Sequence, residues 1–198
     1  MRMSREATAQ SKARILSAAA KMVRERGVDA TSVADVMQDA GMTNGGFYRH
    51  FRSKDEMIAM AIRAAFDEIA DRFDRQLRKN GAAAAIDAYV DEYLSERHLK
   101  HPGYGCPIAA VGTDVGRSRG VFAEEFVAGT EEVIKRLSAR PGGSSRAASE
   151  RTEAIRRLAM LVGAVVIARA VGRGALRNEI FAACNQDLGG HASDDEAS

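Results

Sequence analysis

A regular spacing of apolar residues between positions 58 and 77 limits this part of the chain to helical structure. The apolar residues lie three or four positions apart, at Ile58, Ile62, Phe66, Ile69, Phe73 and Leu77. This spacing places side chains on one face of an α-helix, whereas a half-buried strand needs strict alternation. Ser53 and Glu56 form a capping box just before the run. Gly81 follows it, so the sequence predicts one long helix that ends near Lys79.

Helical spacing recurs along most of the chain, and glycine or capping residues separate the segments. Nine helices are expected, at about 11–27, 33–40, 43–50, 54–79, 86–94, 108–115, 121–139, 146–171 and 176–186. No segment has the alternation of a strand, so we predict an all-α fold. We expect a helix-turn-helix domain at 1–54, a larger helical body at 55–188, and a disordered tail at 189–198, where apolar residues are almost absent.

Charge is distributed unevenly along the 198 residues. Residues 1–54 hold ten Lys or Arg and five Asp or Glu, a net charge of +5, whereas the whole chain has +2. A basic N-terminal quarter favours an anionic partner at that end, although scattered surface charge is an equally good explanation. No apolar run is long enough to span a bilayer, and the two cysteines form no CxxC pair. We therefore expect a cytoplasmic protein with no membrane contact.

The stretch TNGGFYRHF at 43–51 places two glycines inside a predicted short helix. Each glycine costs a helix interior about 1 kcal/mol relative to alanine. Together with the preceding helix and its AGMT turn, this segment forms a helix-turn-helix candidate whose second helix enters the DNA major groove. Bare backbone at Gly45 and Gly46 then permits close approach of phosphates or bases. The alternative is a helical hairpin whose glycines only allow close helix packing.

Residues 31–54, TSVADVMQDAGMTNGGFYRHFRSK, resemble the signature of TetR-family transcriptional regulators. The matching positions are Thr31, Val33, Val36, Ala40, Gly41, Thr43, Phe47, Tyr48, His50, Phe51 and Lys54. The family's pattern departs from this chain at 37–39 and at Gly46, where a larger small residue is common. The resemblance implies an all-helical homodimer. Its N-terminal helices would bind operator DNA and its C-terminal body would bind a small-molecule effector. Binding of the effector would release the DNA.

The resemblance also assigns residues to DNA contact. These are Thr43, Asn44, Gly45, Tyr48, Arg49, His50 and Lys54, with Thr31 or Ser32 touching a phosphate. We therefore predict a repressor of a palindromic operator that needs no cofactor. An activator and a non-DNA protein-binding module on the same fold are the alternatives. An enzyme is not favoured, because the sequence has no nucleophile elbow, phosphate loop or metalloprotease motif.

Aromatic and sulfur-containing residues of the C-terminal body are the candidate effector pocket. They are Phe66, Phe73, Tyr89, Tyr93, His98, Tyr104, Cys106 and Met160, although each is also a typical core residue. His98, His101 and Cys106 have a spacing that could bind a transition metal, but the Pro-Gly break between them makes the geometry unpredictable, and we assign no metal site. The body also holds a candidate dimer interface at Leu158, Leu161, Val162, Val165, Val166 and Arg169, where an ordinary core helix is the alternative.

Overall fold

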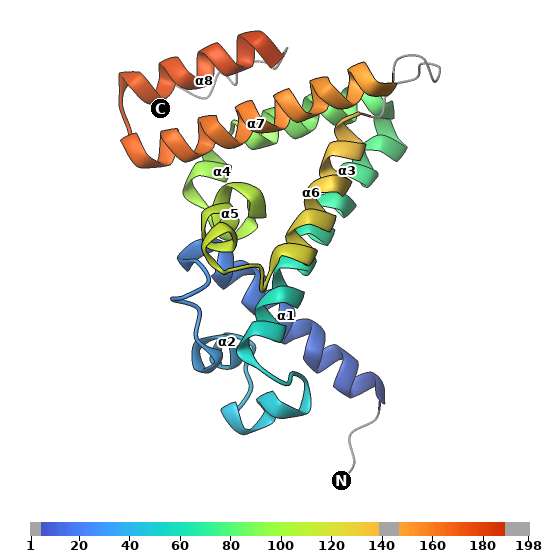
Figure 1. Cartoon of the computed structure of the whole chain (residues 1–198), viewed down its shortest axis with the longest axis vertical. Coiled ribbons are helices and arrows are strands. Elements are labelled where there is room, and N and C mark those ends of the chain that lie inside the picture. Colours follow the sequence, from blue (N-terminus) through green and yellow to red (C-terminus); the bar gives the residue numbers. More distant parts are fainter. Residues whose placement is uncertain (1–4, 139–146, 189–198) are drawn as a thin grey trace. The chain divides into compact units, whose positions relative to one another are not determined.

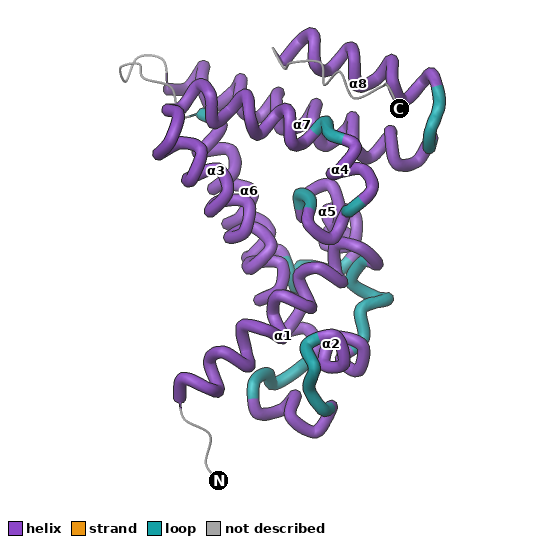
Figure 2. The backbone as a smooth tube through the Cα atoms, turned by 180° about the vertical axis from the view of Figure 1, so that it is seen from behind, coloured by secondary structure: helices purple, strands orange, loops and turns teal. Residues whose placement is uncertain are grey.

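Helices make up almost all of the computed structural model, which describes residues 5–138 and 147–188 (Figure 2). The α-helices are α1 (Arg5–Arg26), α2 (Val33–Asp39), α3 (Lys54–Tyr93), α4 (Glu96–Lys100), α5 (Pro107–Arg117), α6 (Ala123–Leu137), α7 (Ala147–Val171) and α8 (Ala175–Leu188). Two 3₁₀ helices are η1 (Asn44–Arg49) and η2 (Pro102–Tyr104). The described residues form no strand, which confirms the all-α prediction. The predicted disorder at 189–198 concerns residues outside the described ranges.

Glycines end helices where the sequence predicts it. Gly27 has a φ of 82° and its N–H donates to Val23 O at 2.9 Å, which closes α1. Gly81 has a φ of 83° inside α3 and divides it into two helical halves. Residues with a Cβ rarely adopt such positive φ values, so glycine is required at both positions. If α3 is counted as two helices, eight of the nine expected helices are α-helices and the one at 43–50 is η1, whereas α4 and η2 were not expected.

The chain divides into two compact units, of which the first contains residues 1–68 and 102–129. Its core combines Ile15, Ala19 and Val23 of α1 with apolar residues of α2, η1, the start of α3 and α5. In Figure 1 this unit runs from α1 in blue to the start of α3 and includes α5 in yellow-green. The first unit is larger than the predicted DNA-binding domain at 1–54. The boundary of that domain at residue 54 stays a prediction.

Polar groups tie the C-terminal end of α1 to the rest of the first unit. Arg24 is buried, and its guanidinium donates to Ala20 O at 2.9 Å, to Gly105 O at 3.2 Å and to Glu68 Oε2 at 2.7 Å. Asp114 of α5 accepts from the Val28 N–H at 3.0 Å. A buried guanidinium is stable only with hydrogen-bond partners. These contacts therefore hold the C-terminal end of α1 in its position within the first unit.

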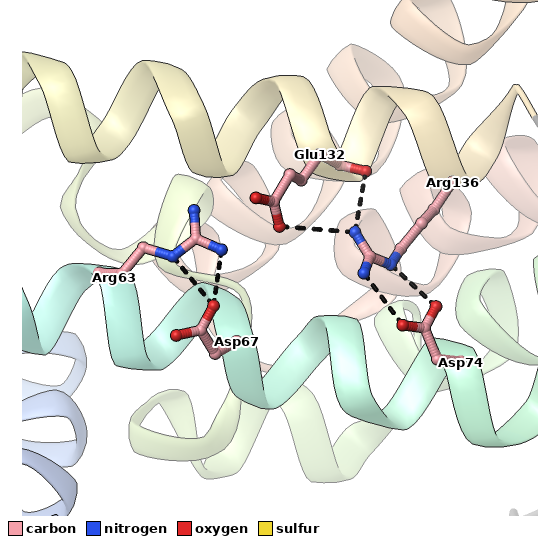
Figure 3. A network of polar contacts seen from close by, with 5 residues as sticks. All are labelled: Arg63, Asp67, Asp74, Glu132 and Arg136. Atoms are coloured by element: carbon pink, nitrogen blue, oxygen red, sulfur yellow. Dashed lines mark hydrogen bonds and ion pairs between the residues drawn. The ribbon is translucent and has the colours of Figure 1, made fainter.

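The second unit contains residues 69–101 and 130–198. Here α3 and α6 are joined by Arg136, which forms two parallel hydrogen bonds of 3.0 Å to the Asp74 carboxylate (Figure 3). These bonds lower the pKa of Asp74. Burial raises it by a smaller amount, so the pKa lies below its ordinary value. Farther along the chain, Arg169 of α7 donates to His98 O of α4 at 2.7 Å.

Candidate nucleic-acid interface

Helix α2 and the turn after it are fixed by a cap at each end. Ser32 is the N-cap of α2, and its Oγ accepts from Asp35 N at 3.1 Å, as the sequence predicts. Gly41 has a φ of 67°, and the next N–H, that of Met42, returns to Met37 O at 2.8 Å. This closure sets the direction in which the chain enters the next helix.

Two basic side chains of α1 support this turn and the segment after it. Arg14 Nη2 donates to Ala40 O, and a Cβ on Gly41 would lie 2.9 Å from the same nitrogen. Lys12 Nζ lies 5.3 Å from the centre of the Phe51 ring, within the range of a cation–π contact. The sequence analysis did not identify either residue, because a charged residue beside an apolar stripe is usually a solvated one.

The segment after the turn is a 3₁₀ helix rather than the short α-helix expected through about His50. Thr43 occupies its N-cap position but makes no side-chain capping hydrogen bond, so the expected cap is absent. Phe47 and Phe51 are buried and stack with ring centres 5.5 Å apart, whereas the Tyr48 side chain is 80% exposed. The tight 3₁₀ turn therefore places two rings in the core and one outside.

The two glycines of this segment have different surroundings. Apart from its own segment, a Cβ on Gly45 would have no atom of the described residues within 4 Å. A Cβ on Gly46 would lie 3.7 Å from Met37 Cε, an ordinary contact distance. Neither glycine has a positive φ. Packing within the chain therefore does not require glycine at position 45, which removes close helix packing as the reason for it there.

Most of the residues predicted to contact DNA lie at the surface of this segment. The exposed ones are Thr43, Asn44, Gly45, Tyr48 and Arg49, and the half-buried ones are Ser32, His50 and Lys54. The structure excludes the predicted phosphate contact of Thr31, since its side chain is fully buried and its Oγ1 donates to Gly27 O at 2.7 Å. Of the two alternatives for a phosphate contact, only Ser32 is accessible. Lys54 Nζ donates to Asp29 O at 3.2 Å, and this contact holds the loop before α2.

Residues 15–61 match the model of the family described as "Bacterial regulatory proteins, tetR family". Over these residues the chain matches the TetR family of regulators. An uncharacterised HTH-type transcriptional regulator of Mycobacterium tuberculosis is 31% identical over 104 residues, which are 52% of each chain. The HTH-type transcriptional repressor KstR2 of the same species is 41% identical over 59 residues, 30% of each chain. The TetR-family chain thus spans about half or less of the length of these curated relatives.

Solved structures resemble the fold over a larger part of the chain. A TetR transcriptional regulator from Legionella pneumophila has a TM-score of 0.71 at 18% identity, covering 94% of this chain and 99% of that one. The reduced form of Escherichia coli NemR has a TM-score of 0.70 at 17% identity, covering 89% and 96%. At this level of identity the likeness concerns the fold alone, and it agrees with the predicted helical architecture.

The eight candidate pocket residues are divided between the two units of the TetR-family chain. Phe66, Tyr104 and Cys106 belong to the first unit, and the other five to the second. Phe73, Tyr89, Tyr93 and His98 form a continuous series of ring contacts, with successive centres 6.3, 5.6 and 4.6 Å apart. Tyr104 is exposed and Met160 is half-buried. Of the eight candidate pocket residues, these four are thus the ones that the ring contacts of the described residues bring together.

No group of three or more His, Cys, Asp or Glu side chains that could hold a metal occurs within 5–138 and 147–188. His98 is buried, and its Nδ1 lies 2.7 Å from Tyr93 O. An open groove of about 310 Å³ lies elsewhere in the second unit and contains none of the predicted pocket residues; Glu131, Glu132, Lys135, Ser138 and Arg151 line it. No helix in the described part of the chain is long and apolar enough to cross a membrane.

Half of the candidate dimer residues on α7 face inward. Leu158, Leu161 and Val165 are buried within the chain's own core, so they are not available to a second copy as predicted. Val162 and Arg169 are half-buried, and Val166 is exposed. The apolar residues exposed on α7 and α8 are instead Ile155, Val166, Ile167, Val171 and Leu176. Because α7 is apolar around most of its circumference, periodicity alone did not distinguish its two faces.

Proposed function

We propose that this TetR-family chain is a DNA-binding transcriptional regulator whose η1 segment lies in the major groove. The observation that carries the proposal is the open backbone at Gly45, beside an exposed Tyr48: apart from its own segment, no atom of the described residues lies within 4 Å of the position of a Cβ. A glycine that internal packing does not require is explained by a molecule outside the chain that approaches the main chain closely.

The surface around Gly45 has the chemistry that DNA recognition needs. Thr43 and Asn44 are short polar residues that can hydrogen-bond base edges or phosphates, and Arg49 adds a positive charge. Arg14 and the buried rings of Phe47 and Phe51 hold these groups on a fixed support. A rigid support lowers the entropy that binding would otherwise cost.

We further propose that the regulator is a repressor that acts as a homodimer and leaves its operator when an effector binds. The M. tuberculosis relative KstR2 is named a repressor, which favours repression over activation. The exposed apolar residues of α7 and α8 would pair with those of a second copy, and two η1 segments would then read the halves of a palindrome. Residues 1–54 would bind DNA, and residues 55–188 would dimerise and bind the effector.

The test is binding of the chain to the DNA immediately upstream of its own gene, measured by fluorescence anisotropy across a range of salt concentrations. The affinity should fall steeply with salt, because phosphate contacts release counterions. Tyr48→Ala and Gly45→Leu should each weaken binding at least about tenfold, a loss of roughly 1.4 kcal/mol. Tyr104→Ala is the matched control, since Tyr104 is an exposed tyrosine of the same unit outside the predicted surface.

Thermal unfolding of the same variants separates a lost contact from a lost fold. Gly45→Leu should unfold close to the native temperature, because a Cβ at that exposed position has no contact within 4 Å among the described residues. Normal binding by a stably folded Gly45→Leu and Tyr48→Ala pair would refute the proposed orientation of η1. Binding that does not respond to salt would refute DNA recognition through phosphates.

A further inference from the structure

Arg157 lies on the face of α7 that is turned toward the protein interior. Only 8% of the residue is exposed, and the buried apolar residues on the same face are Ala154, Leu158, Leu161 and Val165. These positions are three or four apart, so they share one side of the helix with Arg157. A charged residue in such surroundings requires a partner, because removing a guanidinium from water costs several kcal/mol.

The chain supplies Arg157 with almost no partner. Its Nε is buried and has no hydrogen-bond partner, and its one ion pair joins Nη2 to Glu153 Oε1 at 3.9 Å, beyond hydrogen-bond distance. Glu153 is 53% exposed at its side chain and lies on the same helix. By contrast, the buried Arg24 donates three hydrogen bonds of 2.7 to 3.2 Å. Arg157 is therefore held in a buried position that contacts within the chain do not explain.

A second unsatisfied polar group lies on the helix that α7 contacts. The Oγ1 of Thr130, on α6, is buried and has no hydrogen-bond partner. Next to it in sequence, Glu131 accepts two hydrogen bonds of 2.8 and 2.9 Å from Arg151 Nη2 of α7. Arg157 follows Arg151 by six residues, about 9 Å along the helix axis. The second unit thus has an unsatisfied guanidinium nitrogen and an unsatisfied hydroxyl on two helices that this ion pair joins.

We propose that Arg157 binds the anionic group of the effector, and that the effector is an organic carboxylate with an apolar body. This inference rests on the proposed function, since it names the chemistry of the ligand that would release the DNA. A carboxylate matches the planar fork of a single guanidinium and brings one negative charge to one positive charge. A phosphate dianion would leave one charge unpaired in this apolar environment. Because Ala154, Leu158 and Leu161 beside Arg157 are buried, a ligand that reaches Arg157 must displace part of this apolar packing, and an apolar body would replace the contacts that it displaces.

The test measures thermal unfolding of the full chain with octanoate, decanoate and 3-phenylpropanoate, each compared with its primary alcohol. At a concentration near 100 times its Kd, at least one acid should raise the melting temperature of the native chain by about 5 °C or more. The corresponding alcohol should raise the melting temperature by much less. Arg157→Met should abolish that shift. The matched control is Arg156→Met, which removes an exposed guanidinium at the adjacent position and should preserve the shift.

The unliganded variants provide a test that does not depend on the choice of acid. If Arg157 is kept for a ligand, Arg157→Met without ligand should melt at the native temperature or above it, because an apolar side chain of similar length replaces a poorly paired charge. An Arg157→Met chain that melts lower or does not fold would show that the guanidinium supports the fold, and would overturn the proposal. Equal shifts with acids and alcohols, no shift with any of the three acids, or a shift retained in Arg157→Met would also overturn it.

DNA binding separates this inference from the proposed function. Arg157→Met should bind the upstream DNA with native affinity but no longer release it when the acid is added. If the native chain binds no DNA and yet shows the Arg157-dependent shift, the carboxylate site stands while the proposed regulation fails. If it binds DNA and shows no such shift, only the carboxylate site fails.

Discussion

A methyl group added at Gly129 of α6 should destabilise the chain, because this glycine lies directly against the Phe66 ring of α3. A Cβ on Gly129 would lie 2.2, 2.3 and 2.6 Å from the Cδ2, Cγ and Cε2 atoms of Phe66. Carbon atoms in favourable contact are about 3.5–4.0 Å apart, so the overlap exceeds 1 Å. Phe66 is almost fully buried and contacts the Phe126 ring edge to face at 5.8 Å, which leaves its ring little room to turn away.

The expected cost of Gly129→Ala follows from two opposing effects. Overpacking a closed core costs about 1–3 kcal/mol, and more where nothing yields. Alanine in a helix interior recovers about 1 kcal/mol relative to glycine. Because the overlap is severe and involves a ring that is fixed on both sides, we expect a net loss of about 2 kcal/mol, or a melting temperature lower by roughly 4–8 °C.

Urea denaturation followed by circular dichroism measures this loss, and a second glycine is the control. Gly116→Ala, in α5, meets no atom of the described residues within 4 Å and should be neutral or stabilise the chain by up to about 1 kcal/mol. Phe66→Leu should lower the additional cost of Gly129→Ala, since the double variant removes the ring that the methyl group strikes. Equal effects of Gly129→Ala in the two backgrounds, or a stabilised Gly129→Ala chain, would refute the packing argument.

Three further changes test the polar contacts and the backbone. Arg24→Met should cost about 2 kcal/mol in urea denaturation, because it leaves the buried Gly105 carbonyl without its donor. Asp74→Asn should lower stability at pH 7, and the difference from the native chain should disappear as the pH falls below 4. The bond from Arg136 lowers the pKa of Asp74 from its ordinary 3.8. The stabilisation is therefore present above pH 3.8 and is lost as the carboxylate protonates at lower pH. Gly81→Ala should cost about 1 kcal/mol through its positive φ, and Gly81→Asn less, in the same assay.

Local signals predicted the helix boundaries well. The stops at Gly27, Gly41 and Gly81 all have positive φ values. The capping boxes begin helices as expected: Ser53 Oγ accepts from Glu56 N at 3.1 Å, and the Glu56 carboxylate returns to Arg52 N, one residue before the expected position. These signals succeed because a cap involves only neighbouring residues, so tertiary packing rarely changes it.

Features that depend on tertiary contacts were predicted less well. Thr31 and Ser32 are adjacent hydroxyl residues, and only packing against α1 determines which one is buried. The inner and outer faces of α7 were confused for the same reason, because Val165 and Val166 are equally apolar but only one is inside. Arg14 and Arg157 were not identified at all, since nothing in the sequence shows that Arg14 donates to Ala40 O or that Arg157 is buried. The DNA contacts themselves stay a prediction.

The hydrogen bond between Val28 N and Asp114 Oδ2 joins residues 86 positions apart in the sequence. A chain cut after residue 68 would lose that acceptor and also the Gly105 carbonyl that receives Arg24. The fragment would keep every residue expected to touch the operator, but it would expose an amide, a guanidinium and the apolar surface that α5 covers. The end that is expected to read DNA is therefore not a detachable module, and a stably folded truncated version would need replacements for these partners.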